Sequence, residues 1–473
     1  MRLTNQSFRA ARTSSIPTLR AGVRILGAWA AHLSPRHPAQ VIALGFASAI
    51  LGGTVLLMLP TSRVGPGGAS FLEALFTATS AVCVTGLTVV DTPVYWTGAG
   101  QVIILALIQI GGFGIMSFAS LLGVLLARHL GLRSRISTAA ETKSVGIGDV
   151  RRILLGILKI TLLVEAITAV LLSGRFFVGY DRGPAEALWL GVFHAVSACN
   201  NAGFALFSDN LVGYVGDPWI CLPVAGAVIL GGLGFPVLFE LRRRFRYPRK
   251  WFLTTKLVLP GTVLLLVLGT IFITAVEWSS PATLGQLRPD QRVLAGFFQS
   301  TMTRTAGFNS LDIGQLHPVT LLGMDVLMFI GGGPAGTAGG LKITTFAVLF
   351  FIVYTEISGG TAVNVFGKRL PRSVHRQAIS IVLLAGALVV GATMFLMLIT
   401  DFGLDRILFE VVSAFATVGL SAGITADLPS VGQVVLILVM FAGRLGPVTL
   451  ASALALRSRP LQFEYPKERP LIG

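Results

Sequence analysis

Long apolar runs alternate with short polar or basic segments along almost the whole chain. A helix crosses a bilayer core with about 20 consecutive apolar residues, and eight runs approach or exceed that length. They are Val41–Leu59, Val102–Leu126, Ile153–Leu172, Trp219–Leu241, Leu257–Val276, Leu321–Tyr354, Ala378–Ile399 and Val431–Leu456. The pattern therefore predicts eight membrane-spanning helices.

Each pair of predicted spans encloses a shorter apolar run, which is typical of a re-entrant helix rather than a span. These runs are Phe71–Val82, Ala185–Ala198, Val293–Met302 and Ile407–Ala414. Each leads to a glycine that has a phenylalanine ten residues before it and a small hydroxyl residue six residues before it. The glycines are Gly86, Gly203, Gly307 and Gly419, preceded by Phe76, Phe193, Phe297 and Phe409 and by Ser80, Ser197, Thr301 and Ser413. This registration indicates a fourfold internal repeat.

The repeat predicts an all-α polytopic membrane protein built from four parallel M1–P–M2 repeats. Eight spans and four re-entrant pore helices would surround one pore with pseudo-fourfold symmetry. The expected boundaries are a basic cytoplasmic arm at 1–40, repeat 1 at 41–128, repeat 2 with its preceding cytoplasmic loop at 129–242, repeat 3 at 243–357, repeat 4 at 358–457 and a cytoplasmic tail at 458–473.

Composition supports the membrane assignment and explains the charge. Only 12% of the residues are charged and 53% are hydrophobic, whereas a soluble domain carries about 25% charged residues. The net charge of +16 would suit nucleic acid, but most Lys and Arg lie in the N-terminal arm, 128–152, 242–256, 368–376 and the chain from 457 onward. Basic loops on one side follow the positive-inside rule. We therefore expect a multi-pass protein with both termini cytoplasmic and no nucleic-acid partner.

Metal and catalytic motifs are not evident in the sequence. Cys83, Cys199 and Cys221 show no pairing or metal spacing, and the histidines are scattered. His194 has no acidic or cysteine neighbour in sequence, so a structural role is favoured over a ligand role. No P-loop or nucleophile elbow occurs. We expect neither a transition-metal site nor an enzyme.

A second set of glycines recurs inside the second span of each quarter. Gly111–Gly114, Gly231–Gly234 and Gly443–Gly446 predict close helix packing, because small residues let membrane helices approach. The third quarter differs, since glycine costs up to about 1 kcal/mol and proline about 3 kcal/mol in a helix interior. Its segment is Gly331, Gly332, Gly333, Pro334, Ala335, Gly336, Thr337, Ala338, Gly339 and Gly340. We predict two half-helices joined by an intramembrane loop, which would be a natural gate beneath a pore.

The first set of glycines suits cation coordination by the backbone. A cation that leaves water needs oxygen ligands, and glycine allows the backbone angles that turn successive carbonyls to one side. A pore helix ahead of each loop would point its partly negative C-terminal end at the ion. The loops hold no carboxylate, which favours a monovalent cation over Ca²⁺ or Mg²⁺. The alternative is that these glycines only form turns that pack a transporter core.

The four glycine loops, the segment Thr337–Ala338–Gly339–Gly340–Leu341–Lys342 and the Gly443–Arg444 step together resemble the Trk/Ktr/HKT superfamily of potassium transporters. The resemblance covers about Val41–Leu456 and is greatest to the bacterial Ktr-type (KtrB-like) membrane subunit. It implies that potassium is held in a selectivity filter by carbonyls of Val84, Thr85, Gly86, Asn201, Ala202, Gly203, Thr305, Ala306, Gly307, Thr417, Val418 and Gly419. In plant members a serine at the first glycine accompanies sodium permeation, so Gly86 favours potassium.

The same resemblance implies how uptake is gated and which partners take part. The loop 331–340 would form the gate with Lys342 and Arg444, and uptake would be passive or sodium-stimulated, with potassium carried, sodium as an activator and no organic cofactor in this chain. The implied assembly is a homodimer in the plasma (inner) membrane of a bacterium. It would sit on a KtrA-like cytosolic ring of nucleotide-binding regulatory subunits.

Three basic residues in apolar surroundings need partners, because a charge inside a membrane is costly and usually functional. Arg304 lies in the third filter segment and is expected behind the filter, against an outer acid such as Asp312 or Asp91. Lys342 is expected to snorkel or to pair with a carboxylate. Arg444 is expected at the gate, with a buried ion pair between helices as the alternative.

Two other classes of transporter compete with a channel-like protein. One is a secondary active cation symporter of the same superfamily, coupled to sodium or protons and less selective for potassium. The other is a transporter with inverted repeats, which the parallel arrangement of the quarters argues against.

Overall fold

The computed structural model describes residues 38–129 and 147–446. The predicted cytoplasmic tail at 458–473 and nearly all of the predicted arm at 1–40 lie outside the described residues, as does the end of the predicted eighth span. Within the described residues the chain is mostly helical, with one short antiparallel hairpin of β1 (Asn364–Val365) and β2 (Lys368–Arg369).

The helices follow the order that the repeat predicts, quarter by quarter. The first quarter has α2 (Pro38–Leu57), α3 (Phe71–Val82), α4 (Thr92–Tyr95) and α5 (Gly98–His129). The second has α7 (Ile147–Gly179), α8 (Pro184–Cys199), η1 (Val212–Tyr214), α9 (Pro218–Leu233) and α10 (Phe235–Arg244). The third has η2 (Pro248–Lys250), α11 (Leu253–Glu277), η3 (Leu284–Gln286), α12 (Pro289–Met302), η4 (Ile313–Gln315), α13 (Pro318–Phe329) and α14 (Ile343–Ile357). The fourth has α15 (Arg372–Ile399), α16 (Leu404–Ala416) and α17 (Ser430–Leu445) after the hairpin.

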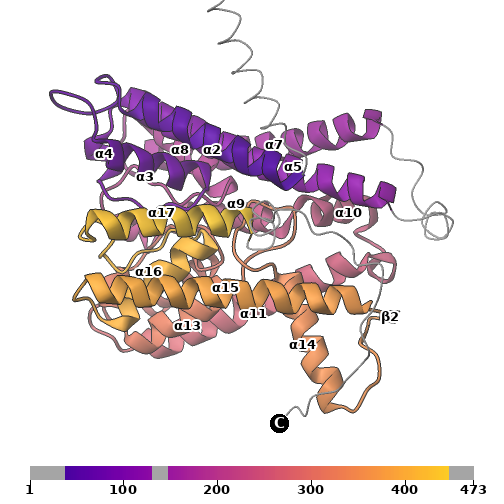
Figure 1. Ribbon diagram of the computed structural model, residues 1–473. Helices are drawn as coiled ribbons and strands as arrows, with labels where there is room; N and C mark the ends of the chain where they lie inside the picture. Colours follow the sequence, from indigo (N-terminus) through magenta and orange to yellow (C-terminus); the bar gives the residue numbers. More distant parts are fainter. Residues whose placement is uncertain (1–37, 130–146, 447–473) are drawn as a thin grey trace, which may run out of the picture.

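The first helix of each quarter lies on the outside of the molecule, where α2 and α15 are seen in Figure 1. Among the described residues, α2, α7, α11 and α15 are long and apolar enough to cross a membrane, and the bent pair α9–α10 would make a fifth span. Their outward faces expose apolar side chains such as Leu51, Val170, Leu268 and Leu398. Extensive exposed apolar surface marks contact with an apolar medium rather than water.

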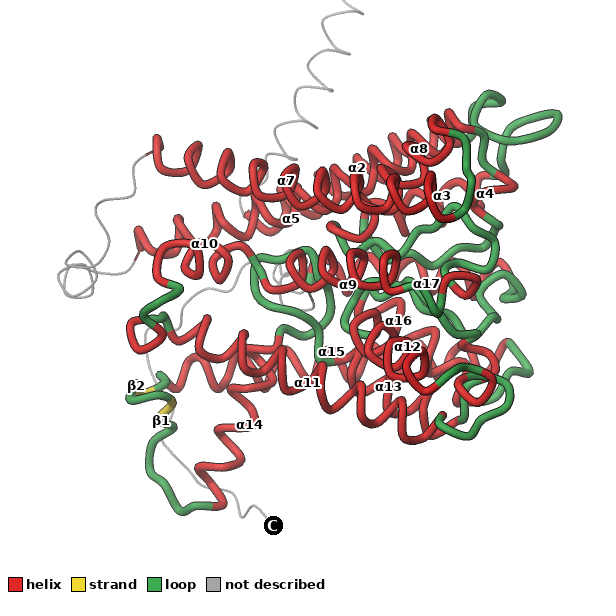
Figure 2. The backbone as a smooth tube through the Cα atoms, turned by 180° about the vertical axis from the view of Figure 1, so that it is seen from behind, coloured by secondary structure: helices red, strands yellow, loops and turns green. Residues whose placement is uncertain are grey.

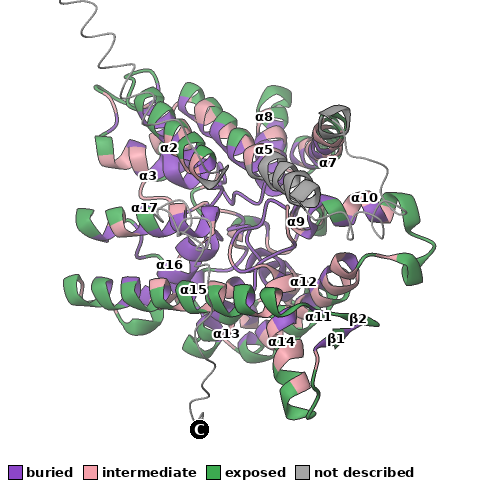
Figure 3. Ribbon diagram, turned by 45° about the vertical axis from the view of Figure 1, so that its right-hand side comes forward, coloured by how far each residue is buried: buried purple, intermediate pink, exposed green. Residues whose placement is uncertain are grey.

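The four short helices α3, α8, α12 and α16 are the predicted pore helices, and their C-terminal halves are buried. Buried residues accordingly gather in the centre of the molecule and exposed ones on its outer helices (Figure 3). Each second helix packs against the pore helix of the following quarter, in the pairs α5–α8, α9–α12, α13–α16 and α17–α3. The four quarters therefore close into a ring. Long loops of the quarters gather at one end (Figure 2).

Within residues 38–129 and 147–446, two of the second helices are broken, although the sequence pattern predicted a break only in the third quarter. The expected break separates α13 from α14 by the loop 331–340. The fourth predicted span also breaks, because α10 turns by 97° from α9 at Gly234. Gly234 has φ +89°, and a proline stands in the first turn of α10. A left-handed residue followed by proline cannot continue a helix.

Glycines in α5, α9 and α17 allow a close approach to the ends of the pore helices. A Cβ on Gly111 would overlap the backbone of Val82, one on Gly231 the carbonyl of Cys199, and one on Gly443 the carbonyl of Phe415. All three contacted residues lie four positions before the filter glycine of their own quarter. The predicted packing role of these glycines is confirmed.

We expect Gly111→Ala to lower the thermal stability of the detergent-purified protein, because overpacking typically costs about 1–3 kcal/mol. Gly114→Ala is a matched control one helical turn away, where a Cβ meets nothing within 4 Å. It should leave the melting temperature unchanged or raise it, since alanine favours helix. Equal melting temperatures for the two variants would contradict the packing contact.

Candidate ion-conduction site

The four filter loops are Val84–Gly86, Asn201–Gly203, Thr305–Gly307 and Thr417–Gly419, and they share one backbone conformation. In each loop the first residue and the glycine have positive φ. The values are +54° and +98°, +58° and +71°, +91° and +68°, and +49° and +93° in chain order. The middle residue of each loop has no positive φ. A positive φ is unfavourable at β-branched residues, so Val84, Thr305 and Thr417 are held in this conformation by their surroundings.

The filter glycines contact one another's loops in a closed cycle. A Cβ on Gly86 would overlap the carbonyl oxygen of Ala202 in the second loop. The same relation joins Gly203 to Ala306, Gly307 to Val418 and Gly419 to Thr85. Each glycine therefore lies against the carbonyl of the next loop, and the fourth loop returns to the first. The loops form one ring in chain order, too tight for a side chain at the glycines.

The hydroxyl residue six positions before the glycine anchors the loop in two quarters. The carbonyl of Ser80 accepts from Thr85 N at 2.8 Å, and its Oγ accepts from Gly86 N at 3.0 Å. Ser413 accepts in the same way from Val418 N at 2.8 Å and from Gly419 N at 3.0 Å. In the first and fourth quarters the hydroxyl therefore holds the N–H of the filter glycine.

The other two quarters use that hydroxyl differently. Ser197 keeps the backbone bond, from Ala202 N at 2.7 Å, but its Oγ donates to the carbonyl of Phe204 at 2.8 Å. Thr301 Oγ1 instead donates to the carbonyl of Phe297 in its own helix at 2.9 Å. The four loops are thus alike in backbone and unequal in their supports.

An acidic cavity of about 450 Å³ opens on the outer side of the ring. It is lined by three of the filter glycines and by Asp91, Asp209 and Asp312, with no basic residue among its lining. A concave surface of one sign of charge raises the local concentration of ions of opposite charge. The cavity is suited to gather cations beside the ring.

The loop 331–340, named the gate loop after the role that the sequence predicts for it, lies on the other side of the ring and is bound to the end of α9. The N–H groups of Gly333 and Thr337 donate to the carbonyls of Gly232 and Gly231 at 2.8 and 3.2 Å. Those carbonyls belong to the last turn of α9, which has no intrahelical donors beyond the break at Gly234. The two broken second helices therefore satisfy each other's backbone groups.

The gate loop is also bonded to the filter itself. Thr337 Oγ1 donates to Asn201 Oδ1 at 3.0 Å, and Asn201 Nδ2 donates to Thr305 Oγ1 at 3.2 Å. A Cβ on Gly339 would overlap the hydroxyl of Thr417. Loop two is thus hydrogen-bonded to the gate loop, loop three is reached through Asn201, and loop four lies in close steric contact with Gly339.

Three basic side chains bind the gate loop through its carbonyls. Arg444 Nη1 donates to Thr337 O at 2.5 Å, and Nη2 to Gly111 O at 3.5 Å. Arg304 Nη2 donates to Gly331 O at 3.2 Å and Nη1 to Thr262 O at 3.3 Å. Lys342 Nζ donates to Ala338 O at 2.5 Å. Arg444 is only 4% exposed and Arg304 only 7%.

These contacts correct the partners expected from sequence. Arg304 does lie behind the filter, but the expected pairing with Asp312 or Asp91 is wrong, because both aspartates line the outer cavity. The ion pairs considered for Lys342 and Arg444 do not form either. Among the described residues, no carboxylate lies within ion-pair distance of any of the three cations. Carbonyl oxygens, not carboxylates, are the available acceptors at this depth.

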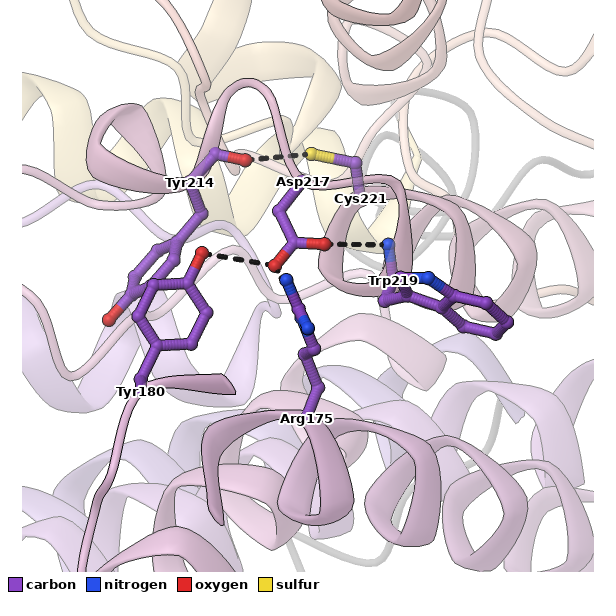
Figure 4. A network of polar contacts seen from close by, with 6 residues as sticks. All are labelled: Arg175, Tyr180, Tyr214, Asp217, Trp219 and Cys221. Carbon is purple, nitrogen blue, oxygen red and sulfur yellow. Dashed lines mark hydrogen bonds and ion pairs between the residues drawn. The ribbon is translucent and has the colours of Figure 1, made fainter. Parts of the chain in front are cut away.

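A second polar cluster fastens the outer loops of the second quarter (Figure 4). Asp217 caps α9 by accepting from Trp219 N at 2.9 Å. It also accepts from Arg175 Nε at 2.7 Å and from Tyr180 OH at 3.0 Å. Burial, and then the neighbouring carboxylate, raise the pKa of Tyr180 to about 12, so the phenol remains a donor. Cys221 Sγ donates to Tyr214 O at 3.4 Å, so it too has a structural partner.

Comparison with known proteins now decides the family. Residues 28–460 match the TrkH family, described as cation transport protein. The chain belongs to the TrkH family. It is a multi-pass membrane ion transporter and not an enzyme, and its fold is the all-α fold of Trk and Ktr proteins.

Several relatives of this TrkH-family chain are nearly as long as it is. It is 40% identical to the Ktr system potassium uptake protein B of Vibrio alginolyticus, covering 92% of this chain and 94% of that protein. It is 40% identical to the protein of the same name from Bacillus subtilis, covering 92% and 97%. It is 36% identical to the potassium/sodium uptake protein NtpJ of Enterococcus hirae, again covering 92% and 97%.

The solved structure of the potassium transporter TrkH from Vibrio parahaemolyticus is similar in fold. It matches with a TM-score of 0.71 and 18% sequence identity, over 89% of this chain and 86% of that one. At that identity the match supports the fold of this TrkH-family chain and nothing finer.

Sequence reasoning about this TrkH-family chain did not single out Glu410, which is fully buried on the pore helix α16. It lies nine positions before Gly419, and His194 lies nine positions before Gly203. The repeat register was the signal that could have drawn attention to it. The ring nitrogens of His194 face the carbonyl of Leu190 and the N–H of Leu206. Among the described residues no group of three or more His, Cys, Asp or Glu could hold a metal ion.

We expect Gly203→Ala to lower cation uptake strongly, because Gly203 has φ +71° and a Cβ there would meet the carbonyl of Ala306. Gly226→Ala on α9 is the control, since a Cβ at Gly226 meets nothing within 4 Å. Tracer uptake into cells with equal amounts of each protein in the membrane measures the effect. Normal uptake by Gly203→Ala would mean that the ring is not the conduction path.

Proposed function

We propose that this chain is a potassium-selective, channel-like uptake protein. Ions pass through the ring of filter loops, and the carbonyls of the twelve filter residues replace their hydration shell. The observation that carries the proposal is the closed cycle of glycine–carbonyl contacts among four loops with the same alternating backbone. Alternation of left-handed and other residues turns successive carbonyls to one side of the strand, as coordination of a cation in single file requires.

The choice of potassium rests on the filter glycines and on the relatives. Two relatives at 40% identity are named as potassium uptake proteins, while one at 36% is named for potassium and sodium. The names of the relatives therefore do not by themselves decide between potassium alone and potassium with sodium as the transported ion. All four glycines of this ring are present, and the loops offer backbone oxygens rather than carboxylates, which favours a large monovalent ion over a hard divalent one.

We propose that the gate loop, with Lys342 and Arg444, closes the path below the filter. This proposal is supported by the hydrogen bonds that Arg304, Lys342 and Arg444 donate to carbonyls of the loop. A potassium ion that leaves the filter would have to pass these positive charges. Two unit charges 4 Å apart interact by about 4 kcal/mol at an effective dielectric constant of 20. Arg304 follows α12 and Arg444 belongs to α17, so displacement of the loop would break its hydrogen bonds to both side chains and open the path.

We also propose where the four repeats begin and end and in which membrane the chain lies. Each of the segments 41–128, 129–242, 243–357 and 358–457 forms one repeat of the ring. Exposed basic residues at the end of α10 and at the hairpin favour a cytoplasmic location for that end. We assign the chain to the plasma (inner) membrane of a bacterium, with both termini in the cytoplasm.

Relatives named as parts of a Ktr system imply association with other components. For this chain we propose a homodimer on a KtrA-like ring of nucleotide-binding subunits, with sodium as an activator. The competing function is a sodium- or proton-coupled symporter, which the potassium/sodium name of one relative favours. Collapse of the sodium and proton gradients would stop a symporter but leave potassium flux down its own gradient through a channel.

The direct test is growth of a bacterium that lacks its own potassium uptake, at limiting potassium, with the chain expressed alone or with a KtrA-like partner. We expect rescue, and stronger rescue with the partner. Failure to rescue in both cases, with the protein present in the membrane, would overturn the proposal.

We expect Gly86→Ser to lower the ratio of potassium to sodium uptake, because a hydroxymethyl group would push against the carbonyl of Ala202 and distort the ring. Parallel tracer uptake of the two ions measures the ratio. An unchanged ratio would argue against the filter assignment.

We expect Arg444→Gln to raise potassium flux about tenfold in the absence of the partner, since removal of a buried charge lowers the barrier for a cation. Arg288→Gln removes an exposed charge whose side chain is 73% exposed and serves as the control. Equal flux in the two variants would show that Arg444 has no gating role.

A further inference from the structure

The pore-helix position nine residues before each filter glycine has a different residue in every quarter. The four residues are Thr77, His194, Phe298 and Glu410. All are at most 1% exposed, so all four point into the packed interior. Two of them carry an acceptor that binds the chain just outside the filter, and in both cases the donor is the N–H three residues after the glycine.

In the fourth quarter this contact is made by Glu410. Its Oε1 accepts from Ala422 N at 3.0 Å and from Ser421 Oγ at 2.5 Å. Its Oε2 accepts from Thr425 Oγ1 at 2.9 Å. Ser421 and Thr425 also line the outer cavity. The carboxylate thus lies behind the cavity wall and holds it through three donors.

In the second quarter the contact is made by His194. Its Nε2 accepts from Leu206 N at 3.2 Å, so the ring proton belongs on Nδ1, which lies 2.7 Å from the carbonyl of Leu190. The ring is stacked on Phe207, with centroids 5.0 Å apart and an interplanar angle of 20°. A neutral imidazole with both nitrogens satisfied holds the loop as the carboxylate does in the fourth quarter.

The remaining two quarters cannot make this contact. Phe298 has no polar atom, and within the described part of the chain Thr77 Oγ1 has no hydrogen-bond partner. Because the ring closes in chain order, the second and fourth loops lie opposite each other. The outer mouth is therefore fastened to its own pore helix at this position on one diagonal only. The outer segments of the first and third quarters are bonded to the second quarter instead, through Asp91 and Asn309.

We propose that His194 and Glu410 are positioning residues that set the width of the outer end of the filter and thereby its preference for potassium over sodium. The inference rests on the proposed function. Carbonyl dipoles around an ion repel one another, and a ring narrows around a smaller ion unless its strands are held from behind. Attachment of two opposite strands to the pore helices maintains the spacing that fits the larger ion.

The test uses the full-length chain in liposomes of phosphatidylethanolamine and phosphatidylglycerol, with potassium and sodium uptake measured in parallel. We expect Glu410→Leu and His194→Leu each to lower the potassium-to-sodium ratio about tenfold, as loss of a buried hydrogen-bond acceptor would do. Glu410→Gln and His194→Gln keep an acceptor at the same reach and should retain most of the ratio. Glu410→Gln loses the charge and His194→Gln loses the packed ring, but both keep an acceptor. A retained potassium-to-sodium ratio in these variants therefore shows that the acceptor, and not the charge or the packing, sets the ratio.

Matched controls occupy the same helix position in the other quarters. Thr77→Val and Phe298→Leu should leave the ratio unchanged. If a leucine variant does not assemble, Ser421→Ala removes a donor from the opposite end of the Glu410 contact and should lower the ratio in the same direction. A wild-type ratio in both leucine variants, or an equal fall in the Thr77→Val control, would overturn the inference. Absence of potassium preference in the unmodified chain would instead overturn the proposed function.

Discussion

In the filter that we propose, carbonyl groups converge on one point and repel one another, so the surrounding structure has to hold them there. In each filter loop two residues adopt positive φ, and only one of the two is glycine. The strain at Val84, Thr305 and Thr417 persists because buried pore helices, hydrogen bonds to Ser80 and Ser413, and the neighbouring loop all fix the backbone. Packing of the surrounding helices thus stabilises a backbone conformation that the loops alone would not keep.

The second helices of the four quarters also help to fix the filter loops, each in one or both of two ways. Where they remain helical, glycines bring them against the last turn of the pore helices and so support the filter from the side. Where they break, the freed carbonyls of α9 are taken up by N–H groups of the gate loop. The gate loop is consequently held by groups that a continuous helix would have used internally, so its hydrogen bonds can be exchanged without unfolding a span.

Much of this arrangement could be predicted from the sequence, because it follows from local spacing. The repeat of phenylalanine, hydroxyl and glycine identified the pore helices and filter loops, and a run of glycines around Pro334 identified the broken span. The break at Gly234 was missed because the glycines before it were assigned to ordinary helix packing, although Pro236 two residues later is a visible signal for the start of a new helix. The acceptors of Arg304 were missed because backbone carbonyls from distant segments have no sequence signature. Glu410 was missed because its equivalence to His194 becomes visible only when the sequences of the four quarters are aligned on their filter glycines.

The ring is made by one chain, so its four walls are encoded separately. In a pore assembled from four identical subunits, a single codon change alters every wall at once, and intermediate states are hard to reach. Here one substitution changes a quarter of the ring and leaves three quarters as they were. The differing supports behind Gly86, Gly203, Gly307 and Gly419 are what such independence allows.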